Sequence, residues 1–228
     1  MQITYYGHSC FGVTLGETHL LFDPFISGNP AAAHINVDDI PADYILISHG
    51  HQDHILDVEV IAKRTGAKII SNHEIVTHYN AKGLENGHGM NHGGHYSFDF
   101  GTVQYVTAVH SSSFPDGTYA GNPGGFVVQD KSGKKAIYYA GDTALTYDMR
   151  LIAEDYDITC ALLPIGNNYT MGVKDAVRCA EFVGTNTVIG LHYNTFPPIT
   201  IDTMAAVQKF AEVGRKLLLP KIGDKVEI

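Results

Sequence analysis

A cluster of histidine and aspartate residues directly after an apolar run constrains this chain more than any other feature. Residues 44–48 read Tyr-Ile-Leu-Ile-Ser, and the residues that follow are His49, Gly50, His51, Gln52, Asp53 and His54. The apolar, β-branched run predicts a buried strand. Because alternate residues of an extended segment point the same way, His49, His51 and Asp53 are expected to converge on one side. His54 then points to another side, so that one loop can serve two adjacent metal ions.

Imidazole and carboxylate donors together suit zinc, iron or manganese, so the cluster predicts a metal site. The alternative is a solvated polar loop that happens to be rich in histidine. That alternative does not explain why the cluster directly follows a buried strand, the place where sites on α/β folds are usually built.

Three further strand-like runs each end at one candidate ligand. Residues 103–109 precede His110, residues 136–140 precede Gly141 and Asp142, and residues 187–191 precede His192. A single histidine or aspartate after a strand is more often a turn residue or a cap. Four strand ends that deliver such groups in this order make a joint case for one shared metal site.

The order His-x-His-x-Asp-His, then His110, Asp142 and His192, resembles the metallo-β-lactamase superfamily. The flanking segments are similar to those of its metal-dependent hydrolases related to the L-ascorbate-6-phosphate lactonase group. These segments are residues 6–9 (Tyr-Gly-His-Ser), 23–25 (Asp-Pro-Phe), 110–113, 140–144, 163–166, 169–172 and 192–197 (His-Tyr-Asn-Thr-Phe-Pro). The chain departs from the expected pattern at 91–95 and 166–172, outside the ligands, which bears on substrate preference more than on metal binding.

The resemblance implies an α/β protein with an αββα sandwich of two mixed sheets flanked by helices, in a single domain over residues 1–228. Periodicity alone supports only an α/β chain with buried strands. It predicts helices over 55–64, 145–154, 173–183 and 201–213, and a loop over 83–94.

The resemblance also implies roles for the ligands. It places His49, His51 and His110 on a first ion, Asp53, His54 and His192 on a second, and Asp142 between them. The cofactor is then two divalent metal ions per chain, with zinc first and manganese or iron as alternatives. A water between two such cations is a hydroxide near neutral pH and serves as the nucleophile. Asp53 and Asp142 are the expected catalytic residues, with Asp53 orienting this hydroxide.

Five further residues are candidates for supporting roles, each with a structural alternative. We expect substrate contacts from His8, Ser111, Asn168 and Asn194. A buried histidine explains the first equally well, and turns or caps explain the other three. Asp23 is expected to accept a hydrogen bond from a ligand imidazole, although an Asp-Pro pair also ends strands. The histidines of the 83–95 loop are interpreted mostly as loop residues, with His92 or His95 the best candidates to reach the cleft.

Composition restricts the partners. The net charge of −9 is unfavourable for nucleic acid, which is bound through basic patches. No apolar run approaches the length of a membrane span, so stable membrane insertion is not expected. The first residues form a strand rather than a signal peptide, and the three cysteines lack zinc-ligand spacing. We therefore expect a cytoplasmic protein with a small-molecule substrate, and formation of a homo-oligomer stays open.

The leading hypothesis is a hydrolase in which a dinuclear-metal-bound hydroxide attacks a small ester, lactone or phosphorylated metabolite. The first alternative is a phosphodiesterase, including action on phospholipid head groups, because two-metal sites also serve phosphoryl transfer. The second is a metal-dependent sensor that does not turn over. The complete ligand set counts against a sensor.

Overall fold

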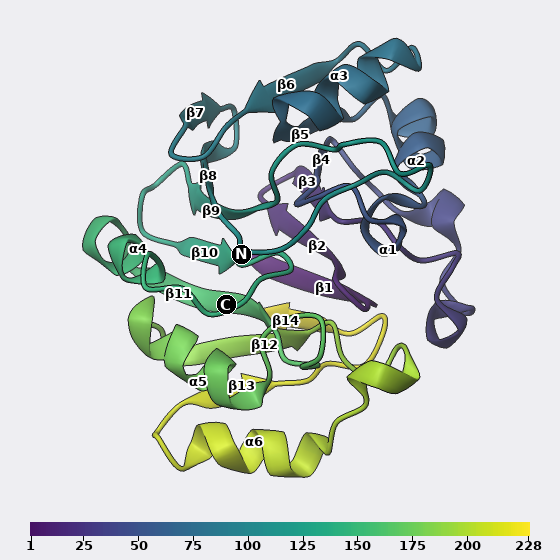
Figure 1. Ribbon diagram of the computed structural model, residues 1–228. Helices are drawn as coiled ribbons and strands as arrows, with labels where there is room; N and C mark the ends of the chain where they lie inside the picture. Colours follow the sequence, from purple (N-terminus) through teal and green to yellow (C-terminus); the bar gives the residue numbers. More distant parts are fainter.

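Two seven-stranded sheets form the centre of the molecule (Figure 1). The computed structural model describes residues 1–228. In order across the first sheet, the strands are β14 (Lys225–Glu227), β1 (Gln2–Gly7), β2 (Cys10–Leu15), β3 (Thr18–Phe22), β4 (Tyr44–Leu46), β5 (Lys68–Asn72) and β6 (Gly87–Met90). In the second sheet they are β13 (Lys216–Leu218), β12 (Thr187–Leu191), β11 (Ile158–Pro164), β10 (Ala136–Tyr139), β9 (Gly124–Asp130), β8 (Gly101–Thr107) and β7 (His95–Phe98).

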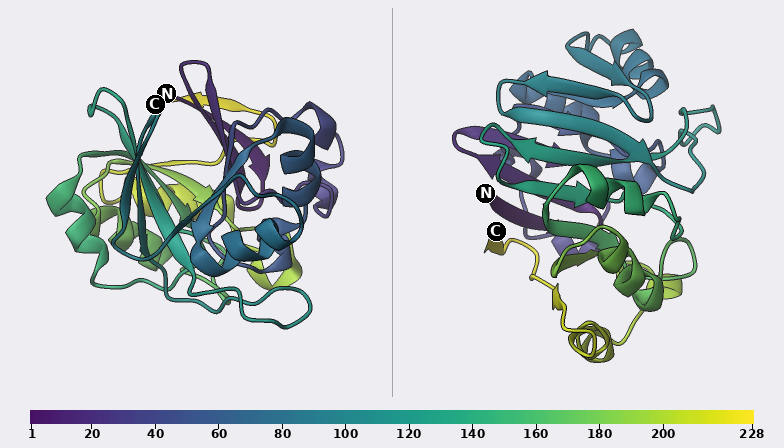
Figure 2. Two further views of the ribbon diagram at one scale, coloured as in Figure 1. Left: turned by 90° about the horizontal axis from the view of Figure 1, so that it is seen from above. Right: turned by 90° about the vertical axis from the view of Figure 1, so that its left-hand side faces the viewer.

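Helices cover the outer face of each sheet, so the layers run helix, sheet, sheet, helix (Figure 2). The first sheet is covered by α1 (Gln52–Ile55), α2 (Val58–Thr65) and α3 (His73–Ala81). The second is covered by α4 (Met149–Asp155), α5 (Val173–Phe182) and α6 (Thr203–Ala211). Short 3₁₀ turns lie at η1 (Pro30–Ala32), η2 (Val37–Asp39) and η3 (Pro197–Ile199). The predicted αββα sandwich of two mixed sheets is therefore confirmed.

Strands that are buried on both faces explain the continuous apolar runs of the sequence. Ile45 packs toward the helices of the first sheet, whereas its neighbour Leu46 packs between the two sheets. Leu162 and Leu163 divide in the same way in the second sheet. Because successive side chains of a strand point to opposite faces, a strand between two apolar layers needs apolar residues at every position.

The strands that carry candidate ligands all point the same way. Each sheet joins a parallel set of strands to an antiparallel set. β1 and β3 are both antiparallel to β2, and β8 and β10 are both antiparallel to β9. The loops after β1, β3, β4, β8, β10 and β12 consequently emerge at one edge of the sandwich, where they build the site.

Several predicted boundaries are corrected. The helix expected over 55–64 is α2, which begins later, at Val58, and a separate short helix, α1, ends at Ile55. Between them, the Asp57 carboxylate accepts hydrogen bonds from the backbone N–H groups of Ile26 and Ser27. The loop expected over 83–94 contains β6, which pairs in parallel with β5. Gly87 is needed there, since a Cβ would lie 2.5 Å from Val76 Cγ1 of α3.

The helices expected over 145–154, 173–183 and 201–213 are α4, α5 and α6, each shorter at one or both ends. The two short strands β13 and β14 were not predicted. β14 pairs with β1, which brings the two ends of the chain together, and the Ile228 N–H donates to the Met1 carbonyl at 3.0 Å. None of the helices has the length and apolar character that crossing a bilayer requires.

Candidate metal centre

The seven ligands expected from the sequence meet at the common edge of the two sheets, and Asp142 lies at their middle. Its Oδ2 atom is 3.0 Å from His192 Nε2, 3.3 Å from His54 Nε2 and 3.7 Å from His110 Nε2. Asp142 and His192 come from the second sheet and His54 from the first, so this carboxylate faces groups from both halves of the fold.

Two subsets of these side chains are close enough to share an ion. In the first, one ligand atom from each of His49, His51 and His110 lies within 4.8 Å of the others, and His49 Nε2 is 3.0 Å from His51 Nδ1. In the second, Asp53 and His54 lie within the same limit of His192 and of His8.

Gly50 allows the ligand loop to pack tightly against the second half of the chain. A Cβ at this position would lie 2.3 Å from the Cβ of Ala120 and 3.2 Å from the carbonyl oxygen of Ser113. The Gly50 N–H donates to Ser112 Oγ at 3.2 Å. The glycine between two candidate ligands therefore sets how closely His49 and His51 approach His110.

Asp23 is fully buried behind the candidate ligands and is surrounded by donors. Its carboxylate accepts hydrogen bonds from the Ser48 N–H at 2.7 Å, from His54 Nδ1 at 2.7 Å and from the Tyr139 hydroxyl at 2.5 Å. A bond at Nδ1 leaves Nε2 of His54 as the atom that faces Asp142. Asp23 thus takes the place that the sequence suggested for it, beside a ligand imidazole.

His8 takes a different place from the one expected. It is buried, Nε2 is 3.0 Å from Asp53 Oδ2, and Nδ1 is 2.9 Å from Thr195 Oγ1. Its ring also lies against His192, with the centroids 4.2 Å apart. Both ring nitrogens already have protein partners, so this position does not suit the predicted direct contact with substrate. His8 contacts the site through Asp53.

The carboxylates favour positive charge on His54 and His192, whereas burial lowers the pKa values of His49, His51 and His110. Burial would raise the pKa of Asp142, but the His192 and His54 imidazoles hold it well below its usual range. Burial would lower the pKa of His192, but Asp142 and Asp53 raise it to about 9. For His54 too, burial acts to lower the pKa, and the surrounding carboxylates raise it well above its ordinary value.

The donors fit a metal ion. His54 Nε2 and Asp142 Oδ1 are buried without a hydrogen-bond partner, which is costly unless another group satisfies them. Without metal, protons on His54 and His192 supply the positive charge that the carboxylates favour. A bound cation supplies the same charge at the same atoms, and neutral imidazole with carboxylate is a common donor set for divalent transition metals.

Backbone strain is concentrated around this centre. His8, Asp23 and His192 have positive φ angles of 53°, 40° and 53°. Non-glycine residues in this region cost about 1–3 kcal/mol each and persist where the surrounding structure fixes them. Each of the three sits directly after a strand, where the hydrogen bonds of β1, β3 and β12 end.

A cavity of about 610 Å³ opens over the candidate ligands. Its polar wall includes His51, Asp53, Ser111 and His192. Ser111 therefore lies where substrate contact was expected. The cavity is also lined by four large apolar side chains that sequence reasoning missed: Phe25, Leu56, Tyr169 and Phe196. Phe25, Tyr169 and Phe196 lie in segments that resemble the family, and this resemblance was the one sequence feature that could have pointed to them.

The other expected contacts lie elsewhere. Asn168 is exposed beside Tyr169, and Asn194 Oδ1 accepts from the Ile201 N–H at 2.8 Å; neither lines the cavity. His92 Nε2 is 2.9 Å from the Pro123 carbonyl oxygen, and His95 belongs to β7. Neither histidine lines the cavity, so the interpretation of His92 as a loop histidine holds and the alternative that either residue reaches the cleft does not. Residues 91–94 connect β6 and β7, which are edge strands of the two sheets.

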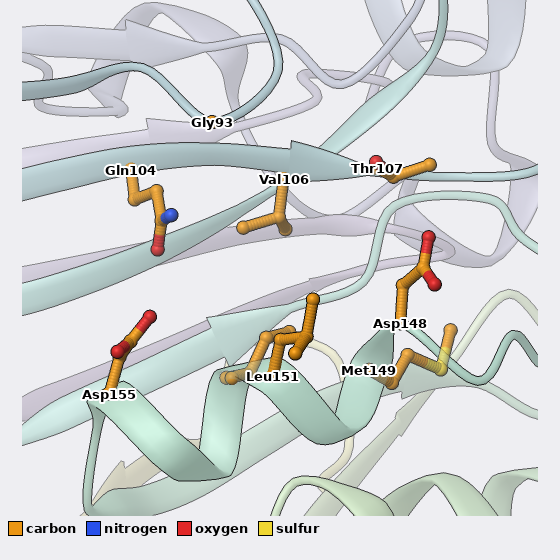
Figure 3. A pocket seen from close by; sticks show the side chains of 9 residues that line it. Gly93, Gln104, Val106, Thr107, Asp148, Met149, Leu151 and Asp155 are labelled. Carbon is orange, nitrogen blue, oxygen red and sulfur yellow. The ribbon is translucent and has the colours of Figure 1, made fainter.

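A second cavity lies between β8 and α4 and is lined by Gln104, Asp148, Leu151 and Asp155, among others (Figure 3). It measures about 160 Å³ and contains none of the candidate site residues. Asp148 and Leu151 are exposed there, away from the candidate ligands, so substitutions at these two positions are suitable controls.

Comparisons with known proteins identify the family of this chain. The family model described as "Beta-lactamase superfamily domain" matches residues 18–193. The chain is 52% identical to a UPF0173 metal-dependent hydrolase of Flavobacterium johnsoniae, with 100% of both chains covered. It is also 52% identical to a UPF0173 metal-dependent hydrolase of Methylacidiphilum infernorum, over 99% of both. Among solved structures, Igni18, a novel metallo hydrolase from the hyperthermophilic archaeon Ignicoccus hospitalis, is 36% identical with a TM-score of 0.89, covering 99% of this chain and 97% of that one.

Proposed function

Because the chain belongs to the beta-lactamase superfamily and is a metal-dependent hydrolase, we propose that it holds two divalent ions and hydrolyses a small ester, lactone or phosphorylated metabolite. In this proposal His49, His51 and His110 hold one ion, and Asp53, His54 and His192 hold the other. Asp142 contacts both. Zinc suits this imidazole-rich donor set, with manganese and iron as alternatives.

The position of Asp142 carries the proposal. One oxygen of this buried carboxylate lies within 3.7 Å of the Nε2 atoms of His54, His110 and His192, which belong to both donor subsets. If only the His49, His51 and His110 triad held an ion, a carboxylate between the two donor subsets would not be needed. When bound, two divalent ions lower the pKa of water toward neutral and polarise the group under attack.

The protein's own residues orient the reactants. Asp53 is the less buried of the two central aspartates, with 28% of its side chain exposed toward the cavity. Its Oδ2 is fixed by His8 at 3.0 Å, which holds the carboxylate in one orientation. We assign Asp53 to orient the attacking water through a carboxylate oxygen. Ser111, at the cavity wall, is placed to donate its hydroxyl to the substrate.

Hydrolysis by the metal-loaded and metal-free protein tests this function. The substrates are p-nitrophenyl esters, simple lactones and a p-nitrophenyl phosphodiester. Turnover of an ester or lactone that depends on added metal and is lost in Asp142→Asn supports the proposal. Asp148→Asn is the matched control, because this exposed aspartate lies at the other cavity. Preferred turnover of the phosphodiester would indicate a phosphodiesterase instead. Tight metal binding with no turnover of any substrate would indicate a sensor.

A further inference from the structure

The cavity over the candidate metal centre has no basic side chain in its wall. The protein has 15 Lys and Arg residues, and none of them is among the 12 residues that line the cavity. Lys82, in a neighbouring groove, is paired with Glu59 at 3.2 Å. Lys221 lines a separate cavity on the other side of His8. A substrate in the main cavity therefore finds no lysine or arginine that could pair with a phosphate or carboxylate.

This absence follows from where the basic residues lie in the sequence. The segments that form the cavity wall belong to four stretches without any Lys or Arg: residues 1–62, 83–130, 151–173 and 179–208. Asp142 comes from a fifth such stretch, residues 136–149. The basic residues lie in helices, at the starts of strands and in turns, and none lies in a ligand-bearing loop.

Apolar side chains from both halves of the chain flank the polar wall of the cavity. Phe25 and Leu56 come from the first half of the chain, and Tyr169 and Phe196 come from the second. The rings of Phe25 and Phe196 lie 6.3 Å apart and form one corner. Leu56 and Tyr169 are 38% and 55% exposed, which leaves large apolar surfaces at the mouth without a partner in the protein. Exposed apolar surface beside a polar centre is typical of a ligand site.

Two divalent ions at this centre would lie beside the carboxylates of Asp53 and Asp142, with Asp23 directly behind, and these three negative charges would offset much of the positive charge of the ions. A charged group on the part of the substrate that does not react would lie among apolar side chains, where an unpaired charge is costly.

From these observations we propose that the substrate is an uncharged ester or lactone with an apolar group that lies against Phe25, Leu56, Tyr169 and Phe196. This narrows the function proposed above, rests on it, and excludes phosphorylated metabolites. In the reaction, the oxygen of water bonds to the acyl carbon and the bond from that carbon to the alkoxy oxygen breaks. The alkoxy oxygen takes one proton, which gives a carboxylic acid and an alcohol, or one hydroxy acid from a lactone.

Binding of a matched pair of dyes tests the cavity without any turnover. N-phenylnaphthylamine is uncharged, and anilinonaphthalene sulfonate adds one sulfonate to the same skeleton. By fluorescence titration of the metal-loaded protein, the uncharged dye is expected to bind at least about tenfold more tightly. Phe196→Ala should weaken its binding, which locates the dye in the cavity. Equal or tighter binding of the sulfonated dye overturns the proposal.

Added charge at the cavity mouth gives the sharper test. Leu56→Lys should remove the preference for the uncharged dye, whereas Leu151→Lys, on α4 at the other cavity, should keep it. Both leucines are already partly exposed, at 38% and 57%. Tyr169→Lys repeats the test should Leu56→Lys fail to fold. A preference that both mouth variants leave unchanged places the dye elsewhere and overturns the proposal.

A matched pair of esters separates failure of this inference from failure of the proposed function. p-Nitrophenyl butyrate and mono-p-nitrophenyl succinate share a leaving group and acyl length, but only the second carries a carboxylate. We expect kcat/KM to favour the butyrate by at least about tenfold, and Leu56→Lys to narrow that ratio. Hydrolysis of both esters at similar rates overturns the inference and leaves the hydrolase function intact. Hydrolysis of neither ester nor any lactone, with the dye preference present, overturns the hydrolase function instead.

Discussion

His54 Nδ1 lies 2.7 Å from Asp23 Oδ2, and neither side chain is exposed to solvent. This contact fixes which face of the imidazole is turned to the centre, because the proton at Nδ1 is held by the carboxylate and Nε2 is left facing Asp142. Asp23 is itself held by Ser48 and Tyr139, which lie on the two different sheets. The orientation of one candidate ligand is therefore set by packing of the whole sandwich.

Asp23→Asn should lower metal affinity about 10- to 100-fold, the usual effect of removing a carboxylate that supports a ligand histidine. The amide is nearly the same size but carries no charge to hold the Nδ1 proton. Competition with a chelating dye measures the affinity. Asp202→Asn, the same change at the N-cap of α6, is the control. Equal affinity in Asp23→Asn and wild type would show that the tautomer is set by another group.

His8→Phe should weaken the more loosely bound of the two ions by about tenfold while leaving the other ion nearly unchanged. The reason is that His8 contacts Asp53 and not the His49 subset. Stepwise metal titration by calorimetry separates the two binding events. His8→Gln, which keeps a donor, should recover part of the loss. Equal weakening of both ions would mean that His8 supports the fold around the site rather than Asp53 in particular.

Saturated protein should contain two metal ions per chain. Seven expected donor residues exceed what one tetrahedral ion uses, and six of them fall into two subsets whose ligand atoms lie within 4.8 Å of one another. Elemental analysis after equilibrium dialysis gives the number. A ratio that stays at one across a range of metal concentrations contradicts the dinuclear arrangement.

Asp142→Ala should reduce hydrolysis by at least about a hundredfold, as expected when a central electrostatic contact is removed. The fold should persist, because Asp142 lies in a loop after β10 and not among the apolar side chains of the core. Steady-state rates are paired with circular dichroism, and Asp148→Ala provides the comparison. Wild-type turnover by a folded Asp142→Ala protein would show that another residue joins the two donor subsets.

Phe126→Ala should destabilise the protein by about 3–5 kcal/mol, the usual cost for a buried phenylalanine. Phe126 is fully buried, and its ring contacts Phe22 of the first sheet and Tyr105 of the second. Urea denaturation measures the free energy of unfolding. Tyr96→Ala, at a half-exposed edge position, should cost much less. Similar losses in both variants would mean that the contact between the sheets is loosely packed.

The sequence by itself predicted an α/β chain with buried strands and showed which strand ends carry candidate ligands, and its resemblance to the metallo-β-lactamase superfamily implied the αββα sandwich. The strand and ligand patterns are local. An apolar run that ends in histidine or aspartate shows both that a strand is buried and that a polar group follows it, as at His49, Asp142 and His192. The relationship to the L-ascorbate-6-phosphate lactonase group and the role of each ligand remain predictions.

The tertiary structure decided the features that depend on residues far apart in the chain. It placed His8 against Asp53 rather than in the cavity, turned the 83–95 histidines away from the site, and paired the short strands β13 and β14 at the sheet edges. It also brought Phe25, Leu56, Tyr169 and Phe196 together around one cavity. The periodicity of the sequence does not predict such contacts, because each contact depends on how the two sheets pack and not on the neighbouring residues in the chain. The apolar wall and the absence of basic side chains from it therefore became visible only when the loops were assembled.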